Sequence, residues 1–274
     1  MFAQEPHMGC NGSQTRRPGR VATRYQLPLG GFDENVISAL IAVTFAVIPP
    51  YIKVCNRNDP EINKCIANSI EHLREKLATG IPELDVPAIE PFRLDNLRLL
   101  RGPSSASLDL NLTDIQVRGP SMFEVHNLKT DVNKLVFTYD LTFKKLEFKG
   151  KYSVNARILL LQLDGVGNLT GYFDNYSGNV IMKAKKVRRD NNIYLHFDKM
   201  KFNIKISKAF FELDNLFNGD KVLGDATNQL LNENNDVILQ EIVPLLKNSL
   251  EKLFTDIANK ITQTFTYEEL FPNN

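Results

Sequence analysis

The feature that most constrains this chain is a long amphipathic helix predicted near its carboxyl end, over residues 236–264. Its apolar residues recur at spacings of three and four, while its charged residues fall elsewhere on the helical wheel. These apolar residues are Ile238, Ile242, Leu245, Leu246, Leu250, Leu253, Phe254, Ile257 and Ile261. At 1.5 Å per residue the segment would be roughly 40 Å long, and Pro244 should bend it within its first turns. So long an apolar face needs an extended partner surface in the same chain.

The candidate partner is the middle of the chain, where apolar residues between Leu94 and Leu213 recur with a period of two and predict β-strands. In the run Leu108, Leu110 and Leu112 the phase slips before Ile115, as a β-bulge would cause. The other runs are Leu135, Phe137, Tyr139, Leu141 and Phe143, then Leu146, Phe148, Tyr152 and Val154, then Ile193, Leu195 and Phe197, and finally Met200, Phe202, Ile204 and Ile206. Long strands with bulges are typical of a twisted, curved antiparallel sheet with one apolar and one wet face.

A shorter amphipathic helix precedes the strands. Asp59 and Pro60 are typical of its start and Gly80 of its end. Its apolar stripe is Ile62, Ile66, Ile70, Leu73 and Leu77. No linker, charge block or low-complexity tract interrupts residues 51–272. We therefore predict one α+β domain, in which a strongly curved antiparallel sheet wraps the long carboxyl-terminal helix.

Residues 1–46 are predicted to be a leader with a secretory signal peptide, and residues 47–274 the folded domain. Four arginines precede an uncharged run over residues 35–52, and a small residue, Ala46, offers a cleavage site near the end of its apolar centre. The alternative is a signal anchor, but the run is shorter than the ~20 residues of a membrane helix, and Pro49 and Pro50 interrupt it. We therefore expect a secreted, extracellular protein.

The net charge limits which classes of partner the chain can bind. Residues 1–46 hold four of the 33 basic and three of the 32 acidic residues, so the remaining chain is neutral. Neutrality argues against nucleic acid as a partner, because phosphate binding needs an excess of Lys and Arg on one face. One basic run, Lys183, Lys185, Lys186, Arg188 and Arg189, has two interpretations. It fits a solvated edge strand protected by charge, or a transient contact with an anionic membrane or a receptor.

Cys55 and Cys65 are the only cysteines outside the leader, and in an oxidising compartment they are expected to form a disulfide. The alternative, a metal site, falls short of four ligands because no histidine is near, so no metal is expected. Three sequons, at Asn111, Asn168 and Asn175, predict glycosylation of a secreted protein.

No motif in the chain indicates catalysis or a cofactor. The glycines of residues 165–171 distantly resemble a dinucleotide-binding loop, but no helix start follows them, and a hairpin turn is the better interpretation. The sequence has no P-loop, HExxH, CxxC or GxSxG motif. His72, His126 and His196 lack acids at motif spacing and are interpreted as surface residues. An esterase is therefore disfavoured, and we expect no enzyme activity, catalytic residue or cofactor.

The predicted sheet and helices carry more apolar surface than an ordinary layered domain needs. Either these side chains pack into a solid core or they line a cavity, and periodicity does not separate the two. On periodicity alone a solid core is favoured, because protein interiors are normally close-packed.

Nearly the whole mature chain resembles the takeout/juvenile hormone-binding protein family of insects, which has circadian and feeding-related members. The residues that carry the resemblance are Ile52-Lys-Val-Cys55 with Asp59-Pro60 and Cys65, Gly80-Ile-Pro-Glu-Leu84 with Pro87, Gly150-Lys-Tyr152 leading to Leu159-Leu-Leu161 and Gly165, Phe217-Asn-Gly-Asp220 with Leu223-Gly224, and the ending at residues 267–272. The resemblance implies a TULIP-type fold, a Cys55–Cys65 pair and a tunnel for a hydrophobic ligand. It therefore favours the cavity over the solid core.

We predict a monomeric carrier that binds a small hydrophobic ligand, such as a juvenile hormone-like terpenoid, a fatty acid or a related lipid. Tyr139 or a buried Thr would orient the polar group of that ligand. From strand and helix phase, the expected lining is Leu110, Phe123, Val125, Phe137, Tyr139, Leu141, Leu159, Leu161, Phe202, Ile204, Phe211, Ile238, Ile242, Leu246 and Phe254. The alternative is a secreted interaction or signalling protein with a filled core that acts through its surface.

Overall fold

The computed structural model describes residues 48–102, 107–158 and 161–273. The chain divides into two units, Met1–Thr44 and Phe45–Asn274, and all described residues belong to the second. The predicted leader with its cleavage near Ala46, and Leu159 of the expected lining, lie outside the described residues.

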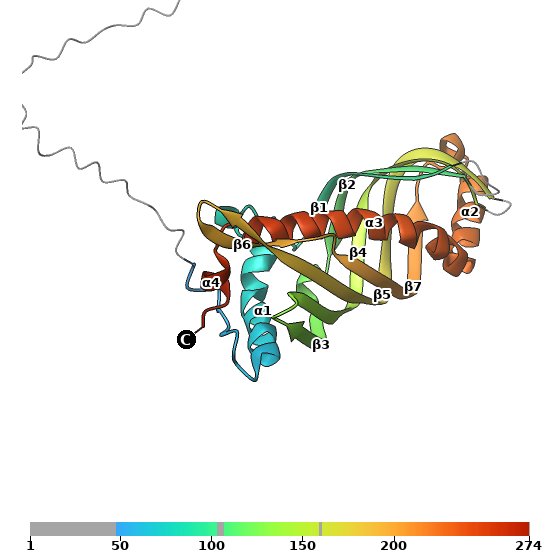
Figure 1. Ribbon diagram of the computed structural model, residues 1–274. Helices are drawn as coiled ribbons and strands as arrows, with labels where there is room; N and C mark the ends of the chain where they lie inside the picture. Colours follow the sequence, from blue (N-terminus) through green and yellow to red (C-terminus); the bar gives the residue numbers. More distant parts are fainter. Residues whose placement is uncertain (1–47, 103–106, 159–160, 274) are drawn as a thin grey trace, which may run out of the picture. The chain divides into compact units, whose positions relative to one another are not determined.

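A seven-stranded antiparallel sheet dominates the described chain (Figure 1). Its strands are β1 (Phe92–Arg101), β2 (Ser107–Arg118), β3 (Glu124–Asp131), β4 (Val136–Ile158), β5 (Leu161–Arg189), β6 (Asn192–Phe197) and β7 (Lys201–Leu213). The order is β1-β2-β4-β5-β6, with β3 paired to β4 and β7 paired to β5. Because β4 and β5 have 23 and 29 residues, each pairs with different neighbours along its length. The long strands expected from the period of two are confirmed.

The slip predicted before Ile115 is confirmed as an irregularity in the pairing of β2 with β4. The register shifts between Thr113 and Gln116, and Asp114 in this interval has a φ of 54°. The extra residue lets Ile115 point inward again, where it is buried.

The apolar runs that end at Phe143 and begin at Leu146 differ in phase, and the structure has an irregularity between them. Regular pairing with β5 is interrupted opposite Asn175, whose φ is 48°. Leu141 and Phe143 face the interior before this point, and Leu146 faces it afterwards. The irregularity therefore keeps the apolar face of the sheet on one side.

Residues 165–171 do not form the hairpin turn expected from the sequence, because they lie within β5. A side chain would collide at these glycines: a Cβ on Gly171 would lie 2.2 Å from the Phe210 carbonyl oxygen. A Cβ on Gly165 would lie 3.0 Å from the Tyr152 hydroxyl. These glycines mark close approach within a strand rather than a reversal of the chain.

The two predicted helices are confirmed as α1 and α3, and the structure adds α2 and α4. α1 (Ile62–Thr79) ends at Gly80, whose φ is 89°. α2 (Lys221–Glu233) begins after Asp220, whose carboxylate accepts a hydrogen bond from the Leu223 amide at 3.0 Å. α3 (Asn235–Thr262) is the predicted long helix and continues through Pro244. The remaining elements are α4 (Tyr267–Leu270) and the short 3-10 turns η1 (Pro82–Leu84), η2 (Pro120–Met122) and η3 (Phe217–Gly219).

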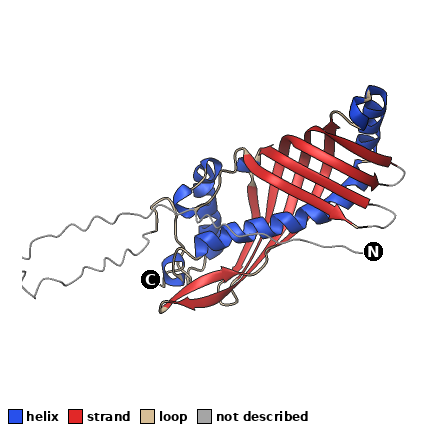
Figure 2. Cartoon of the chain, turned by 90° about the horizontal axis from the view of Figure 1, so that it is seen from above, coloured by secondary structure: helices blue, strands red, loops and turns tan. Residues whose placement is uncertain are grey.

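Helix α3 runs along the inner side of the curved sheet, and the strands cross over it (Figures 1 and 2). Figure 1 shows α2 at one end of α3 and α1 with α4 at the other. α3 contacts β1 on one flank and β6 and β7 on the other. The predicted α+β fold, a curved antiparallel sheet wrapped around the carboxyl-terminal helix, is confirmed.

Side chains from α2 and α3 hydrogen-bond the backbone of β7 and β6 as a neighbouring strand would. Asn228 bonds both the N–H and the C=O of Leu213, at 3.0 and 2.9 Å. Asn232 does the same for Phe211, at 2.9 and 2.7 Å. Further along, Glu251, Thr255 and Asn259 accept hydrogen bonds from the amides of Phe202, Met200 and Phe197 at 3.0, 2.8 and 2.7 Å. This polar ladder satisfies backbone groups that an edge strand would otherwise expose.

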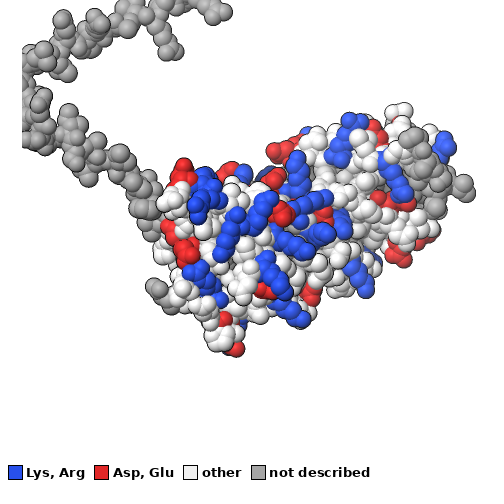
Figure 3. Space-filling model, viewed as in Figure 1, with Lys and Arg blue, Asp and Glu red and all other residues white. Residues whose placement is uncertain are grey.

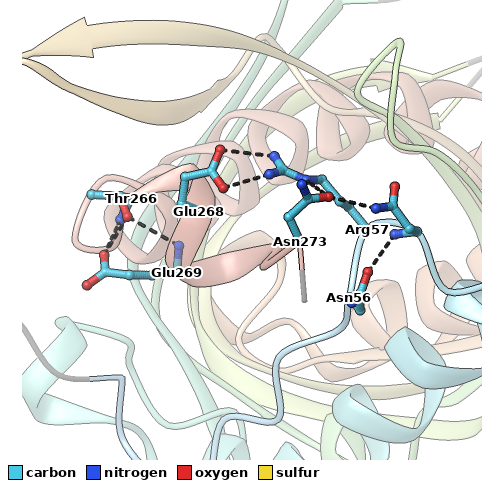
Figure 4. Close-up of polar contacts among 7 residues, drawn as sticks. Asn56, Arg57, Thr266, Glu268, Glu269 and Asn273 are labelled. Atoms are coloured by element: carbon cyan, nitrogen blue, oxygen red, sulfur yellow. Dashed lines mark hydrogen bonds and ion pairs between the residues drawn. The ribbon is translucent and has the colours of Figure 1, made fainter.

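The amino-terminal segment is tied to the last turn of the described chain. The predicted disulfide is confirmed, with Cys55 and Cys65 joined at 2.01 Å. Figure 4 shows the Arg57 guanidinium donating to both carboxylate oxygens of Glu268, at 3.0 and 2.7 Å, and to the Asn273 amide oxygen at 3.1 Å. Bidentate pairing of this kind fixes geometry as well as distance.

Candidate functional site

An apolar cavity of about 500 Å³ lies between the inner face of the sheet and helices α1, α2 and α3. The part of α3 on its wall runs from Ile238 to Ile257, which is roughly 28 Å at 1.5 Å per residue. Voids in close-packed interiors are seldom larger than a water molecule, whereas ligand pockets are commonly 300–1,000 Å³. The surplus of apolar surface therefore encloses a space and does not fill it.

The described wall is largely apolar and includes no charged residue. The helices contribute Ile70, Leu77, Leu231, Ile238, Ile242, Leu246, Leu250, Phe254 and Ile257. The strands contribute mainly Leu, Val and Phe side chains, from β1 through β5 and from β7. A wall of this composition stabilises an apolar guest by removing its surface from water, at about 25 cal/mol per Å².

Three tyrosines supply the polar groups on this wall: Tyr139, Tyr152 and Tyr176. The Tyr152 hydroxyl is used within the fold, since it donates to the Asp214 carbonyl oxygen at 2.5 Å. Burial, with the nearby negative charge of Asp214, raises the pKa of Tyr152 to about 12.

The other two tyrosine hydroxyls form weaker hydrogen bonds within the fold, or none. The Tyr139 hydroxyl lies 3.5 Å from the Met182 sulfur, which is a weak acceptor. The Tyr176 ring packs edge-on against Phe143, and its hydroxyl has no hydrogen-bond partner among the described residues. Burial raises the pKa of both groups, so both remain neutral donors at physiological pH. A bound molecule with an acceptor oxygen could satisfy them.

The structure brings ten of the fifteen expected lining residues to the cavity wall. They are Leu110, Phe123, Val125, Tyr139, Leu141, Phe211, Ile238, Ile242, Leu246 and Phe254. Leu161 is the first residue of β5, and Leu159 is outside the described residues. Whether these residues contact a ligand stays a prediction.

Phe137, Phe202 and Ile204 do not lie on the wall, contrary to expectation. Phe137 lies beyond the cavity, with its ring 5.9 Å from that of Phe197. Phe202 and Ile204 do face inward, but they belong to a cluster that α3 covers directly, and the Phe202 ring lies 5.7 Å from that of Phe254. Strand phase gave the correct side of the sheet here, but it carried no information on where α3 lies against it.

Several wall residues were missed by sequence reasoning. β1 contributes Leu94, Leu97 and Leu99, and the segment before it contributes Val86, Pro87 and Ile89. Tyr176, on β5, was also absent from the expected lining. The spacing of the β1 leucines could have indicated that these residues face the cavity. The proline-rich segment has no regular period, so its inward-facing residues could not be inferred from the sequence.

Typical nucleophiles and acid–base side chains are absent from the described cavity wall. None of the wall residues is a Ser, Cys, His, Asp or Glu. His126 contacts the Thr142 hydroxyl at 3.1 Å and His196 contacts the Gln263 amide at 2.9 Å, both away from the cavity wall. No group of three or more potential metal ligands occurs in the described part of the chain. Within the same residues, no helix is long and apolar enough to cross a bilayer.

Comparison with known proteins agrees with this architecture. A family model described as haemolymph juvenile hormone binding protein (JHBP) matches residues 36–272. The circadian clock-controlled protein daywake of Drosophila melanogaster is 27% identical over 234 residues, which cover 81% of this chain and 88% of the relative. Daywake of Drosophila yakuba is 26% identical with the same coverage. The crystal structure of Epiphyas postvittana Takeout 1 matches with a TM-score of 0.69 at 22% identity, over 81% of this chain and 100% of that chain, and so shares its fold. The chain therefore belongs to the haemolymph juvenile hormone binding protein (JHBP) family.

Proposed function

We propose that this protein is a secreted carrier that holds one small apolar molecule in the cavity between α3 and the curved sheet. The observation that carries the proposal is the uncharged wall around a space of about 500 Å³. Such a cavity excludes water when it is empty. A bound molecule stabilises it, because the wall atoms then make van der Waals contacts that they otherwise lack. The family is one of hydrophobic-ligand binding proteins, which supports a carrier rather than an enzyme.

The wall favours a neutral guest with one acceptor oxygen. A carboxylate would be buried without any cation, because no Lys, Arg or His lies on the described wall. Burial of an unpaired charge is costly enough that the group neutralises instead. The hydroxyls of Tyr139 and Tyr176 instead suit an ester, ether, epoxide or ketone. A terpenoid ester is thus a better candidate than an ionised fatty acid.

Secretion is part of the proposal. The Cys55–Cys65 disulfide is typical of an oxidising compartment, and the family description names haemolymph. Circadian control of its production is a further expectation, drawn from the names of the Drosophila relatives.

Native mass spectrometry of the protein from a secreting host tests the proposal. We expect a co-purifying apolar molecule, or uptake of a fluorescent lipid by stripped protein. Leu246→Trp, which places an indole in the cavity, should reduce uptake at least tenfold. The matched control Val222→Trp, at a side chain 79% exposed on α2, should not. Uptake that Leu246→Trp leaves unchanged would show that the probe binds elsewhere and would overturn the assignment of the cavity.

A further inference from the structure

The described chain has no net charge, but its basic and acidic residues are unevenly distributed along the sequence. Residues 181–208 hold nine Lys and Arg against two Asp, while the other described residues hold 20 basic and 27 acidic residues. The basic segment comprises the end of β5, all of β6 and the first half of β7. Figure 3 shows Lys and Arg side chains gathered on the face of the molecule that this segment shares with α3. The overall charge balance therefore conceals a strongly basic face.

The centre of this segment is a two-stranded hairpin with an unusual outer side. Its turn is Asp190–Asn191, and both residues have positive φ, 48° and 66°. Lys185 pairs with His196 and Val187 pairs with Tyr194, so these side chains share one face. Val187 is 40% exposed, which is high for an apolar side chain. The outer side thus carries an aliphatic and an aromatic residue flanked by cations.

The same face continues onto β7. Lys201 pairs with Ile181, which lies on the same side of β5 as Lys183 and Lys185 by strand alternation. Lys185 forms an ion pair with Asp198 at 3.2 Å. By contrast, Lys183, Lys201 and Lys205 have no acidic partner within 4 Å among the described residues, and all three are exposed. Their charges remain available to an external anion.

We propose that the β5–β6 hairpin and the start of β7 form a docking surface for an anionic phospholipid membrane. The lysines would lie against phosphate and carboxylate headgroups, and attraction of this kind falls with added salt. Tyr194 and Val187 would enter the interfacial layer, where aromatic side chains are enriched in membrane proteins. A nucleic acid or an acidic protein would bind the cations equally well, but neither would remove the exposed Val187 side chain from water.

Docking does not depend on the proposed cargo, because it is derived from charge and exposure and not from the cavity. It does, however, place the membrane against the same strand, β5, whose Phe173 and Tyr176 form part of the cavity wall. A carrier that collects or delivers a poorly soluble molecule would gain from such proximity.

Sedimentation with phosphatidylcholine vesicles, with and without phosphatidylserine, tests the proposal at low and physiological salt. The full chain should bind vesicles that contain phosphatidylserine, and less so as salt rises. The triple variant Lys183→Glu, Lys201→Glu and Lys205→Glu should bind at least about 100-fold more weakly, at roughly fivefold per charge. The matched control Lys129→Glu, Lys144→Glu and Lys149→Glu makes the same charge change on exposed lysines of β3 and β4 and should keep most binding.

Val187→Ser separates the interfacial contact from the charge, since it should weaken binding without changing the salt dependence. Equal losses in the two triple variants, or equal binding to vesicles without phosphatidylserine, would overturn the proposal. So would salt-dependent binding of DNA or polyglutamate in the absence of vesicle binding. Thermal unfolding should show both triple variants folded. Vesicle binding that persists in a protein unable to take up lipid would contradict the proposed carrier function and leave the docking surface standing.

Discussion

At the scale of single residues, Tyr176 decides what kind of guest the cavity prefers. It lies on the apolar cavity wall and its hydroxyl lacks a hydrogen-bond partner among the described residues, so a ligand oxygen that accepts from this hydroxyl adds a hydrogen bond. Tyr152 cannot take this role, because Asp214 already holds its hydroxyl.

Tyr176→Phe should therefore weaken binding selectively. For an ester or epoxide ligand we expect a loss of about 0.5–1.5 kcal/mol, which is roughly twofold to tenfold in affinity. A hydrocarbon of the same length should bind as well as before, because the aromatic ring is retained. Competition against a fluorescent lipid measures both. Equal losses for the two ligands would mean that Tyr176 acts only through packing.

The three sequons differ in how accessible their amide nitrogens are. The Asn168 amide nitrogen donates to the Asp214 carboxylate at 2.8 Å, and the Asn111 side chain is half-buried in β2. Asn175 is exposed at the irregularity of β5, and no described side chain bonds its amide. Glycan transfer needs a reachable amide nitrogen, so Asn175 is the favoured acceptor.

Asn175→Gln should remove one glycan mass from protein made in a secreting eukaryotic host, and Asn168→Gln should remove none. Intact-mass analysis before and after deglycosylation gives the answer. A glycan retained at Asn168 would show that its bond to Asp214 forms only after modification, or not at all.

At the scale of elements, the polar ladder between the helices and the β6–β7 edge depends on one buried charge. The Glu251 side chain is only 5% exposed, and its carboxylate accepts from the Phe202 amide and pairs with Lys199 at 2.9 Å. Burial pushes the pKa of Glu251 upward, but the Phe202 amide and the charges of Lys199 and Lys247 outweigh it and leave the pKa lowered. The ionised form is thus the one that the fold stabilises.

Glu251→Gln should lower the free energy of unfolding by about 1–3 kcal/mol at pH 7. A group whose pKa is lowered by folding stabilises above its unfolded value, here 4.5, and loses that contribution as pH falls through the folded value. The difference between wild type and variant should therefore shrink below about pH 4.5 in urea titrations. Asp256→Asn, at an exposed position on α3, is the control and should change stability little at any pH. A difference that stays constant down to pH 3 would contradict the role of the charge.

Periodicity was sufficient to predict α1, α3 and the strand runs of β2, β4, β6 and β7, but not their contacts. The apolar stripe of α3 and the slip before Ile115 follow directly from spacings in the chain, and both were found there. Asn228, Asn232 and Asn259 gave no such signal, because on a helical wheel they are ordinary polar residues. Their hydrogen bonds to the strand backbone can be recognised only once the fold places the edge of a distant strand beside them. For the same reason Phe202 was assigned to the cavity: its phase is correct, but α3 covers it.

At the scale of the whole described unit, α3 is held differently on its two flanks. Toward β6 and β7, the polar ladder fixes it through backbone hydrogen bonds at several levels of the sheet. Toward β1, the described contacts include an ion pair between Arg101 and Glu241 and a stack of Phe92 on Phe254, with ring centroids 5.9 Å apart. A flank held by side-chain contacts opens at lower cost than one whose opening leaves buried backbone groups unpaired.

Ligand exchange should therefore open the flank between α3 and β1, with the ladder side acting as the hinge. Arg101→Cys with Glu241→Cys, joined by a short bismaleimide, should slow release of a fluorescent lipid at least tenfold. The matched control joins Lys199→Cys to Lys247→Cys, which flank Glu251 on the ladder side, and should leave the rate unchanged. Cys55 and Cys65 do not react, because they are already joined. Stopped-flow transfer to vesicles measures the rate. If only the control cross-link slows release, the flank of α3 toward β6 and β7 is the one that opens, contrary to the prediction. If neither cross-link slows release, the ligand leaves past an end of α3 and not along its side.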